Sequence, residues 1–231
     1  MIYQNSTNLT VEQVYQDLRA KILALKLKPG QMVSENAVAI LYGMSRTPIR
    51  AVFQRLANEN LLEIRSQKGT YVSLLDFAYI RETVYIRTMV EIDILRQALL
   101  RSDDNLLSAL SANLQQQAAI VAQGTAADPA EFYQLDSLFH RLSFQHVGRE
   151  RLWDILQASA VHYHRFRMLD ILSDSILDML WNDHNRIFVC LRSQDQEALG
   201  QSLQAHLSDG IRRIEEQVLL NHPEYFSKSN G

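Results

Sequence analysis

Hydrophobic residues change their spacing along this chain, and the change divides it into two parts. Between residues 34 and 56 they recur at helical spacing in two short runs, and residues 61–74 then read as two strands joined by a turn. From about Phe77 onward the helical periodicity continues almost without interruption. The pattern predicts a small mixed domain over residues 9–75 and a helical domain over residues 76–225.

The first short run predicts a helix that ends in a tight turn. Ser34 can cap a helix that runs to about Tyr42, and Gly43 supplies the turn that follows. The apolar residues of this helix fall on one face at helical spacing, and they are Ala37, Val38 and Leu41.

The second run predicts a helix with a polar, cationic start. Ser45 is placed to cap it, and its first turn contains Arg46, Thr47 and Arg50. A helix N-terminus offers free N–H groups and a partial positive charge, so these side chains form a site for phosphate oxygens and base edges. An apolar stripe is expected to hold the helix in place, and it consists of Ile49, Val52, Phe53 and Leu56.

A glycine-tipped hairpin is predicted directly after this helix. Residues 61–65 and 70–74 are strand-like, and the turn between them contains Lys68 and Gly69. Lys68 would reach phosphates or the minor groove, and Gly69 would let the backbone approach closely. A Lys-Gly turn alone is usually a solvated hairpin, and a capped cationic helix can be an ordinary surface helix. Their order along this chain predicts a winged helix-turn-helix that binds DNA.

Residues 10–75 resemble the DNA-binding domain of the GntR family of bacterial transcription regulators. The resemblance is carried by the segments DLRAKI (17–22), LKPG (27–30), SE (34–35), MSRTPIR (44–50) and KGTYV (68–72). It implies that DNA is contacted by Arg46, Thr47, Arg50, Lys68 and Gly69.

The resemblance also suggests roles for individual side chains. Arg50 is a candidate reader of guanine, whereas Ser45 and Thr47 are expected on phosphates. Asn36 is a weaker candidate for the same surface. The family usually has a glutamate after the second arginine of the recognition helix, and this chain has Ala51 there, which puts the fine sequence preference in question rather than the fold.

The distribution of charge agrees with a DNA reader joined to a different module. Residues 1–75 hold nine Lys and Arg against five Asp and Glu, whereas the rest of the chain holds 14 against 21. The net charge of −3 therefore hides a basic first domain and an acidic second one.

Two further features limit the class of protein. No apolar run approaches the roughly 20 residues of a membrane helix, and the start of the chain lacks a signal-peptide pattern, so we expect a cytoplasmic protein without a membrane partner. Cys190 is the only cysteine, which excludes an intrachain disulfide and a cysteine metal cluster.

The second domain is predicted to be an antiparallel bundle of six helices, because short breaks separate long periodic segments. The predicted spans are 77–101, 104–123, 129–147, 149–172, 174–193 and 195–220. The fold class is thus mainly α, with a small β-wing in the first domain.

Four residues of the bundle could meet at a metal ion. Asp136 and His140 are four residues apart and share one helix face, while His184 and His206 lie on two later helices that can pack antiparallel. From spacing alone, histidines of this kind are more often structural residues than ligands.

The motifs around these four residues resemble the metal-binding subset of the FCD effector domain, a common partner of GntR heads. They are LD (135–136) with FH (139–140), DH (183–184) with Ile187, and AHL (205–207). The resemblance implies that Asp136, His140, His184 and His206 bind a divalent transition metal. Three imidazoles and a carboxylate suit Zn²⁺, Ni²⁺, Mn²⁺ or Fe²⁺, and Zn²⁺ is the expected ion.

In similar FCD domains the effector is often an organic acid. Arg87 matches a family position that points into this cavity and could bind a carboxylate. The alternative is a surface ion pair with Glu91 one turn away. Arg165 and Arg167 are either further anion contacts or solvated residues.

The sequence therefore predicts a transcription regulator, expected to be a repressor, that binds a palindromic operator as a homodimer and responds to a small carboxylate. One alternative is a constitutive DNA-binding regulator whose metal is purely structural. A metalloenzyme is the other alternative, but no motif supplies a general base or nucleophile.

Overall fold

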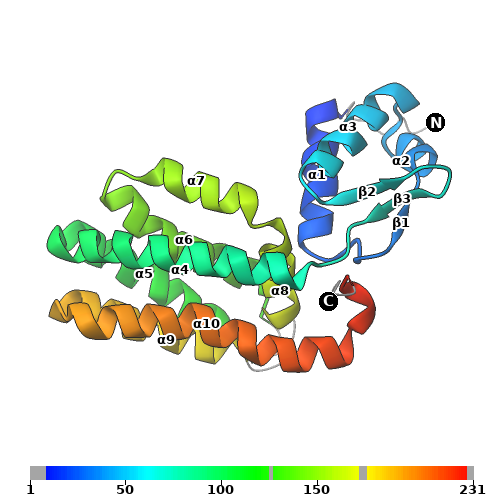
Figure 1. Ribbon diagram of the computed structural model, residues 1–231. Coiled ribbons are helices and arrows are strands. Elements are labelled where there is room, and N and C mark those ends of the chain that lie inside the picture. Colours follow the sequence, from blue (N-terminus) through cyan, green and yellow to red (C-terminus); the bar gives the residue numbers. More distant parts are fainter. Residues whose placement is uncertain (1–8, 125–126, 172–175, 228–231) are drawn as a thin grey trace. The chain divides into compact units, whose positions relative to one another are not determined.

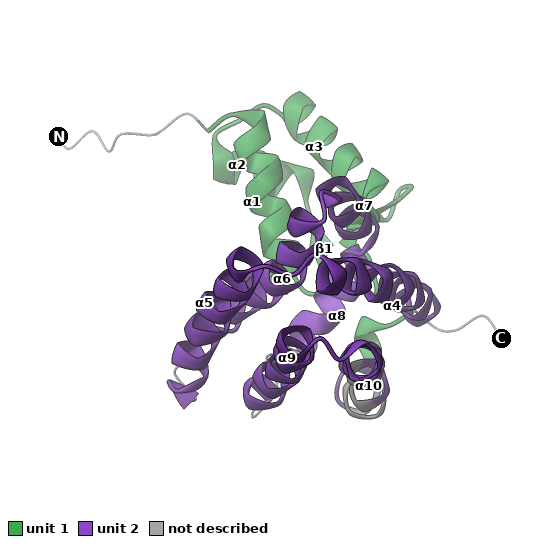
Figure 2. Ribbon diagram, turned by 90° about the vertical axis from the view of Figure 1, so that its left-hand side faces the viewer, with its two compact units in different colours: residues 1–75, 224–230 green, residues 76–223, 231 purple. Residues whose placement is uncertain are grey.

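The computed structural model describes residues 9–124, 127–171 and 176–227. The chain forms two compact units (Figure 2). Among the described residues, the first unit contains 9–75 together with 224–227, and the second contains those between 76 and 223.

In the part of the chain that the structure describes, the first unit contains three α-helices and a three-stranded antiparallel sheet (Figure 1). Its sheet has the strand order β1-β3-β2, and Glu63 of β2 lies opposite Tyr71 of β3. The winged helix-turn-helix expected from the sequence is present. Strand β1 was not predicted, because two residues are too short to show alternation. The elements are α1 (Val11–Leu23), β1 (Met32–Val33), α2 (Glu35–Tyr42), α3 (Arg46–Asn58), β2 (Leu62–Arg65) and β3 (Gly69–Val72).

Helix α2 begins and ends as predicted, but of the three residues on its predicted apolar face only Val38 is buried. The Ser34 hydroxyl accepts a hydrogen bond from the backbone N–H of Ala37, and Gly43 ends the helix with a φ of +64°. The buried residues are Val38 and Ala39, whereas Leu41 is 69% exposed. The helix packs against α3 on a face rotated from the predicted one.

Helix α3 buries the predicted stripe of Ile49, Val52, Phe53 and Leu56. These side chains pack in the first unit's core, where α1 lies against α3. The C-terminal segment also belongs to this unit, because residues after the short 3₁₀ helix η2 (Pro223–Tyr225) pair with the chain that follows β3. The Leu75 N–H donates to the Tyr225 carbonyl at 2.8 Å, and the Ser227 N–H donates to the Leu75 carbonyl at 2.9 Å.

The second unit is a helical bundle whose described helices number seven (Figure 1). The long helices pack in the order α4, α10, α9, α5, α6 and back to α4. One apolar cluster joins α5, α6 and α9 through Ile120, Phe132, Ile176 and Leu180. The helices are α4 (Phe77–Leu100), α5 (Asp104–Val121), α6 (Pro129–His146), α7 (Glu150–Ser159), α8 (Val161–Ile171), α9 (Ile176–Ser193) and α10 (Gln196–Asn221).

The predicted single helix over 149–172 is two helices, and its last predicted residue lies outside the described residues, as does residue 174. Helix α7 ends at Ser159, and Ala160 is the residue at the break. Helix α7 is buried on one side, whereas almost every described side chain of α8 is buried and α8 contacts α4, α6, α9 and α10. One straight helix could not be buried on one side along its first half and on all sides along its second half. Among the described helices, none is long and apolar enough to cross a membrane.

Candidate metal centre and DNA-binding surface

The four predicted metal ligands lie together in the bundle. Asp136 and His140 come from α6, His184 from α9 and His206 from α10, and all four are buried. Their ligand atoms lie within 4.8 Å of one another. The one-turn spacing on α6 and the packing of α9 against α10 bring the ligands together, as the sequence predicted.

Each of the three imidazoles has an acceptor at Nδ1, on the side away from the other ligands. His140 Nδ1 lies 2.7 Å from Glu91, His184 Nδ1 lies 2.8 Å from Gln117 Oε1, and His206 Nδ1 lies 3.3 Å from Asp183. An acceptor at Nδ1 holds the proton there, so the Nε2 lone pair becomes the available metal ligand.

The amide of Gln117 is oriented by its other contact. Its Nε2 donates to Asn113 Oδ1 at 2.6 Å, and Asn113 Nδ2 donates to the Leu135 carbonyl at 3.0 Å. This chain of bonds turns Gln117 Oε1 toward His184. The amide therefore accepts the His184 Nδ1 proton, as a carboxylate would.

His184 Nε2 faces the other ligands and is a buried nitrogen without a hydrogen-bond partner among the described residues. It lies 3.5 Å from Asp136 Oδ1. Buried polar atoms are rarely left without a partner. A divalent cation between Asp136 and the three imidazoles would satisfy this nitrogen, so the residues fit a metal ion.

The titration of these groups favours the metal-binding forms. Burial opposes ionisation of Asp136, but Arg167 and the neighbouring imidazoles outweigh it and hold the carboxyl pKa well below its usual range. Burial also lowers the pKa of His184 and of His206. At neutral pH the cluster therefore has an ionised carboxylate and at least two neutral imidazoles, the protonation states that coordinate metals.

The DNA-binding candidates at the start of α3 are exposed. Arg46, Thr47 and Arg50 all lie in its first turns, and the Arg50 side chain is 69% exposed with its Nε 3.5 Å from Glu35. Ser45 occupies the N-cap position, but its side chain makes no capping hydrogen bond. The capping bond expected of Ser45 is therefore absent, and its hydroxyl is not used to close the helix.

The other DNA-binding candidates lie on the hairpin and on α2. Lys68 and Gly69 are exposed at the β2–β3 turn, where Gly69 has a φ of +105° that other residues rarely adopt. Asn36 is exposed in the first turn of α2. By contrast, Arg55 binds Glu12 and stacks on the Tyr15 ring, so it joins α3 to α1.

The chain matches two family models in sequence. Residues 10–72 match the model described as bacterial regulatory proteins of the gntR family, and residues 82–209 match the FCD domain. The chain belongs to the GntR family. It carries the FCD type of C-terminal domain, and it is a transcription regulator rather than an enzyme, which answers the metalloenzyme alternative.

Relatives of this GntR regulator include proteins named as repressors. It is 30% identical to the HTH-type transcriptional repressor RspR of Escherichia coli, over 92% of this chain and 93% of that protein. It is 22% identical to the gluconate operon transcriptional repressor of Bacillus subtilis, over 92% and 90%. Among solved structures, E. coli McbR/YncC has the same fold, with a TM-score of 0.71, 19% identity, and coverage of 90% of this chain and 99% of that one.

Arg87 of the GntR regulator was predicted either to bind a carboxylate effector or to pair with Glu91 on the surface. It forms the ion pair with Glu91, but both side chains are buried rather than on the surface. Its Nη1 also donates to the Tyr163 hydroxyl at 3.1 Å, and the guanidinium lies 5.7 Å from the centre of the Trp153 ring. Burial opposes ionisation of Glu91, but Arg87 and His140 outweigh it and lower the pKa of Glu91 to about 2.

The basic residues of α8 were predicted to be either anion contacts or solvated residues. Arg165 and Arg167 are both buried, and Arg167 Nη2 binds Asp136 Oδ1 at 2.8 Å. The segment mixes basic and aromatic residues without an apolar face, so periodicity gave no sign of burial. The outer acceptors Glu91, Gln117 and Asp183 were also missed as parts of the metal centre, because their proximity depends on how the helices pack.

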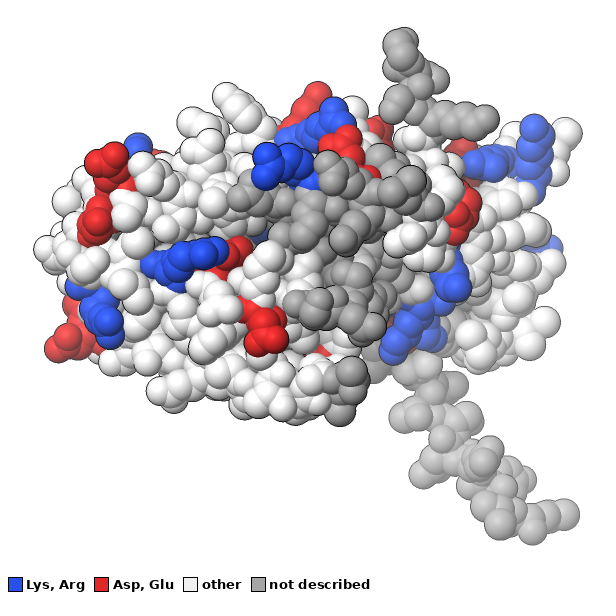
Figure 3. Space-filling model, turned by 90° about the horizontal axis from the view of Figure 1, so that it is seen from below, with Lys and Arg blue, Asp and Glu red and all other residues white. Residues whose placement is uncertain are grey.

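Acidic and basic side chains are interspersed on the face of the FCD unit seen at the left of Figure 3. The described residues of this face therefore do not form a basic patch of the kind that DNA requires. The exposed cations at the start of α3 and on the hairpin remain the candidates for DNA contact.

Proposed function

We propose that this GntR regulator is a repressor whose homodimer binds a palindromic operator, and that an organic acid bound beside a metal ion lowers its operator affinity. The observation that carries the proposal is the convergence of Asp136, His140, His184 and His206. Two relatives are repressors, and one of them is named for the operon of an organic acid, gluconate.

The DNA-binding role is assigned to exposed residues of the first unit. Arg50 would read a base edge, because an arginine can donate two hydrogen bonds to guanine in the major groove. Ser45, Arg46 and Thr47 would bind phosphates at the N-terminus of α3. The wing would contribute Lys68 and Gly69, with Asn36 at the edge of the same surface.

The metal-binding role is assigned to the four converging ligands. Zn²⁺, Ni²⁺, Mn²⁺ and Fe²⁺ all accept imidazole and carboxylate donors, so the donor set alone does not select one of them, and we propose Zn²⁺ because it commonly takes four nitrogen and oxygen donors. When bound, the ion would supply positive charge, and if it takes five or six donors it would also offer a position for a carboxylate. The protein supplies the oriented nitrogens and a dry surrounding.

The charges around the ligands favour an anionic effector. Arg87 and Arg167 balance the buried carboxylates Glu91 and Asp136. A divalent ion added to this neutral set carries two positive charges that these buried residues do not compensate. A small carboxylate would compensate these charges. Arg87 uses two of its nitrogens in hydrogen bonds to Glu91 and Tyr163. The third nitrogen of its guanidinium can donate to the carboxylate.

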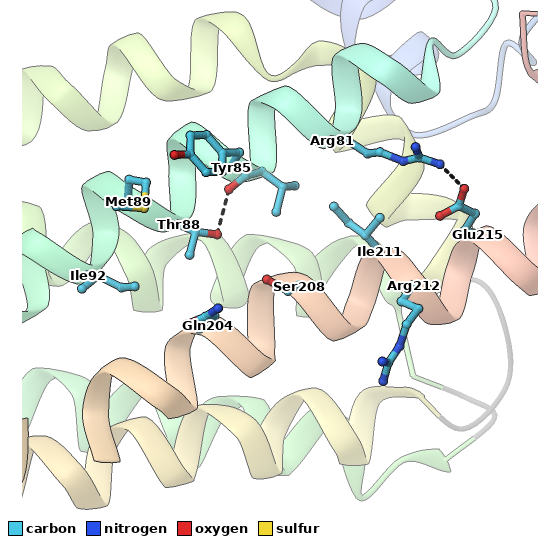
Figure 4. Close-up of a pocket in the computed structure, with 11 residues that line it drawn as sticks. Arg81, Tyr85, Thr88, Met89, Ile92, Gln204, Ser208, Ile211, Arg212 and Glu215 are labelled. Atoms are coloured by element: carbon cyan, nitrogen blue, oxygen red, sulfur yellow. Dashed lines mark hydrogen bonds and ion pairs between the residues drawn. The ribbon is translucent and has the colours of Figure 1, made fainter. Parts of the chain in front are cut away.

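The homodimer is proposed to form through α4. This helix exposes Tyr85, Ile86 and Met89 at helical spacing, and neighbouring exposed apolar residues of this kind can form an association surface. Tyr85 and Met89 line one side of a groove of about 330 Å³ between α4 and α10 (Figure 4). We assign this face to a second copy of the chain, because a single head can read only one half-site.

The test is metal analysis of protein purified without chelator or nickel resin, followed by thermal shifts with small carboxylates. Stoichiometric metal, with a carboxylate shift only in the metal-loaded protein and weaker operator binding in its presence, is the expected result. Metal without any carboxylate shift would favour the constitutive regulator with a structural ion. A protein with neither metal nor shift would overturn the proposal.

A further inference from the structure

Glu91 is a buried carboxylate that the proposed function does not use directly. It is 2% exposed and lies on α4, one turn after Arg87. Its two oxygens serve different groups, since Oε1 accepts from Arg87 Nε and Oε2 accepts from His140 Nδ1 at 2.7 Å. One carboxylate therefore joins the expected effector anchor to an expected metal ligand.

The contact with His140 decides which nitrogen can bind a metal. While Nδ1 donates its proton to Glu91, only Nε2 has a free lone pair, and Nε2 faces His206 across 3.2 Å. A carboxylate at Nδ1 also increases the electron density of the ring and its strength as a ligand. His184 has only the neutral Gln117 in this place, so the carboxylate acceptor at His140 is not a general requirement of the cluster.

We propose that Glu91 is a positioning residue that fixes the metal-binding form of His140 and couples it to Arg87. This role rests on the proposed metal-dependent effector site. It adds the residue through which the effector anchor Arg87 and the metal ligand His140 influence each other. An anion bound to Arg87 competes with Glu91 for the guanidinium and weakens the ion pair between Arg87 and Glu91. The carboxylate then acts more strongly on His140, so the anion and the metal favour each other's binding.

The first test compares the Zn²⁺ affinity of the full-length wild type with that of Glu91→Gln, by competition with a chromophoric chelator. We expect the affinity of Glu91→Gln to be tenfold to 100-fold weaker. The matched control is Glu82→Gln, which makes the same change at an exposed position of the same helix and should leave the affinity unchanged. Equal affinities for wild type and Glu91→Gln would overturn the role of Glu91.

The second test addresses the coupling and also uses Zn²⁺ alone. Arg87→Gln removes one partner of Glu91, so it should tighten Zn²⁺ binding in the wild-type background. Part of this effect comes from removing a positive charge near the ion and should survive in any background. The effect should therefore be several-fold smaller in Glu91→Gln, and an equal effect in both backgrounds would contradict the coupling.

A spectroscopic measurement keeps the proposal testable if a variant fails to fold. Long-range ¹H–¹⁵N correlation spectra of the wild-type protein report which ring nitrogen carries the proton. His140 should carry it on Nδ1 both without metal and with Zn²⁺ bound, and binding of Zn²⁺ through Nδ1 would overturn the role of Glu91. If the wild type binds no Zn²⁺, the proposed metal site fails, and the metal-free spectrum still decides whether Glu91 holds the His140 proton.

Discussion

His140 Nε2 and His206 Nε2 lie 3.2 Å apart inside the FCD unit. Each ring has a carboxylate acceptor at its Nδ1, Glu91 for His140 and Asp183 for His206. If both protons stay at Nδ1, two lone pairs face each other, which is unfavourable unless a cation or a proton lies between them. The outer carboxylates thus prepare the pair to receive a positive charge.

Removing one inward-facing imidazole should remove the response to metal. We expect His184→Ala to bind Zn²⁺ much more weakly, so that Zn²⁺ no longer raises its melting temperature, whereas Zn²⁺ at 100 times the dissociation constant should stabilise the wild type by about 2.7 kcal/mol. The measurement is the thermal shift on adding Zn²⁺ to chelator-treated protein. Comparing each protein with and without metal removes the cost of losing the buried side chain itself.

The control for this prediction is His146→Ala. His146 lies on α6 beyond the cluster, and its Nε2 contacts the Arg101 carbonyl rather than the other ligands. This variant should keep the full Zn²⁺ shift. An unchanged Zn²⁺ shift in His184→Ala would remove His184 from the ligand set.

Most of the fold could be predicted because local signals agreed with the tertiary structure. Ser34, Gly43 and the stripe from Ile49 to Leu56 mark the helix-turn-helix, and long periodic segments mark the bundle. The break at Ala160 carried no glycine or proline and could not be read from the sequence. It is imposed by packing, since α8 is surrounded by four helices whereas α7 is not.

The candidate metal site was predictable only in part, for a related reason. Asp136 and His140 are one turn apart, so their shared face follows from helix geometry. Glu91 and Gln117 approach the cluster from α4 and α5, and nothing in the spacing along the chain fixes which of their neighbours they meet. Arg167 was left open for the same reason, although it binds Asp136 directly.

A substitution in the recognition helix should separate sequence readout from stability. Arg50→Ala should weaken operator binding by about 1–3 kcal/mol if the guanidinium reads a base, and should leave metal content and the stability of the FCD unit unchanged. Binding is measured against operator DNA and against a scrambled duplex, because loss of a base contact lowers the ratio of the two affinities.

Arg55→Ala is the matched control on the same helix. Its guanidinium binds Glu12 and lies 3.4 Å from the centre of the Tyr15 ring, so it holds α3 to α1. This variant should lower the stability of the head but keep the ratio of operator to scrambled affinity. If Arg50→Ala also keeps that ratio, Arg50 does not read the operator.

A charge on the exposed face of α4 should disrupt the proposed dimer. Met89 is 54% exposed and lies near Tyr85 at the groove between α4 and α10 (Figure 4). In Met89→Glu, burial of a carboxylate against the second copy would be unfavourable, so we expect monomers and much weaker operator binding. Light scattering after size-exclusion chromatography measures the mass. The control Gln115→Glu adds the same charge at an exposed position of α5 and should remain dimeric. If Met89→Glu is also dimeric, the dimer interface does not include this face of α4.

Acid should destabilise the FCD unit partly through His162, whose environment disfavours the imidazolium. Burial, with Arg165 nearby, outweighs the carboxylate of Asp76 and lowers the pKa of His162 to about 4. Its Nδ1 accepts from the Asp76 N–H at 3.2 Å and lies 3.3 Å from Arg165 Nη2, and the imidazole contacts the Tyr79 ring edge to face. Protonation would turn this acceptor into a donor that faces other donors.

The direction of the pH effect follows from the lowered pKa. The unfolded chain binds the His162 proton near pH 6.5, so the stabilising contribution is complete above that pH and is lost as the pH falls toward 4. Between pH 7 and pH 5 the loss is about 2 kcal/mol. His184 and His206 titrate in the same direction, so the measurement compares urea unfolding of wild type and His162→Asn at both pH values. Asn keeps an acceptor but cannot titrate, so the free energy of unfolding of His162→Asn should fall less on acidification than that of the wild type. Equal losses of unfolding free energy in the two proteins would show that His162 does not contribute.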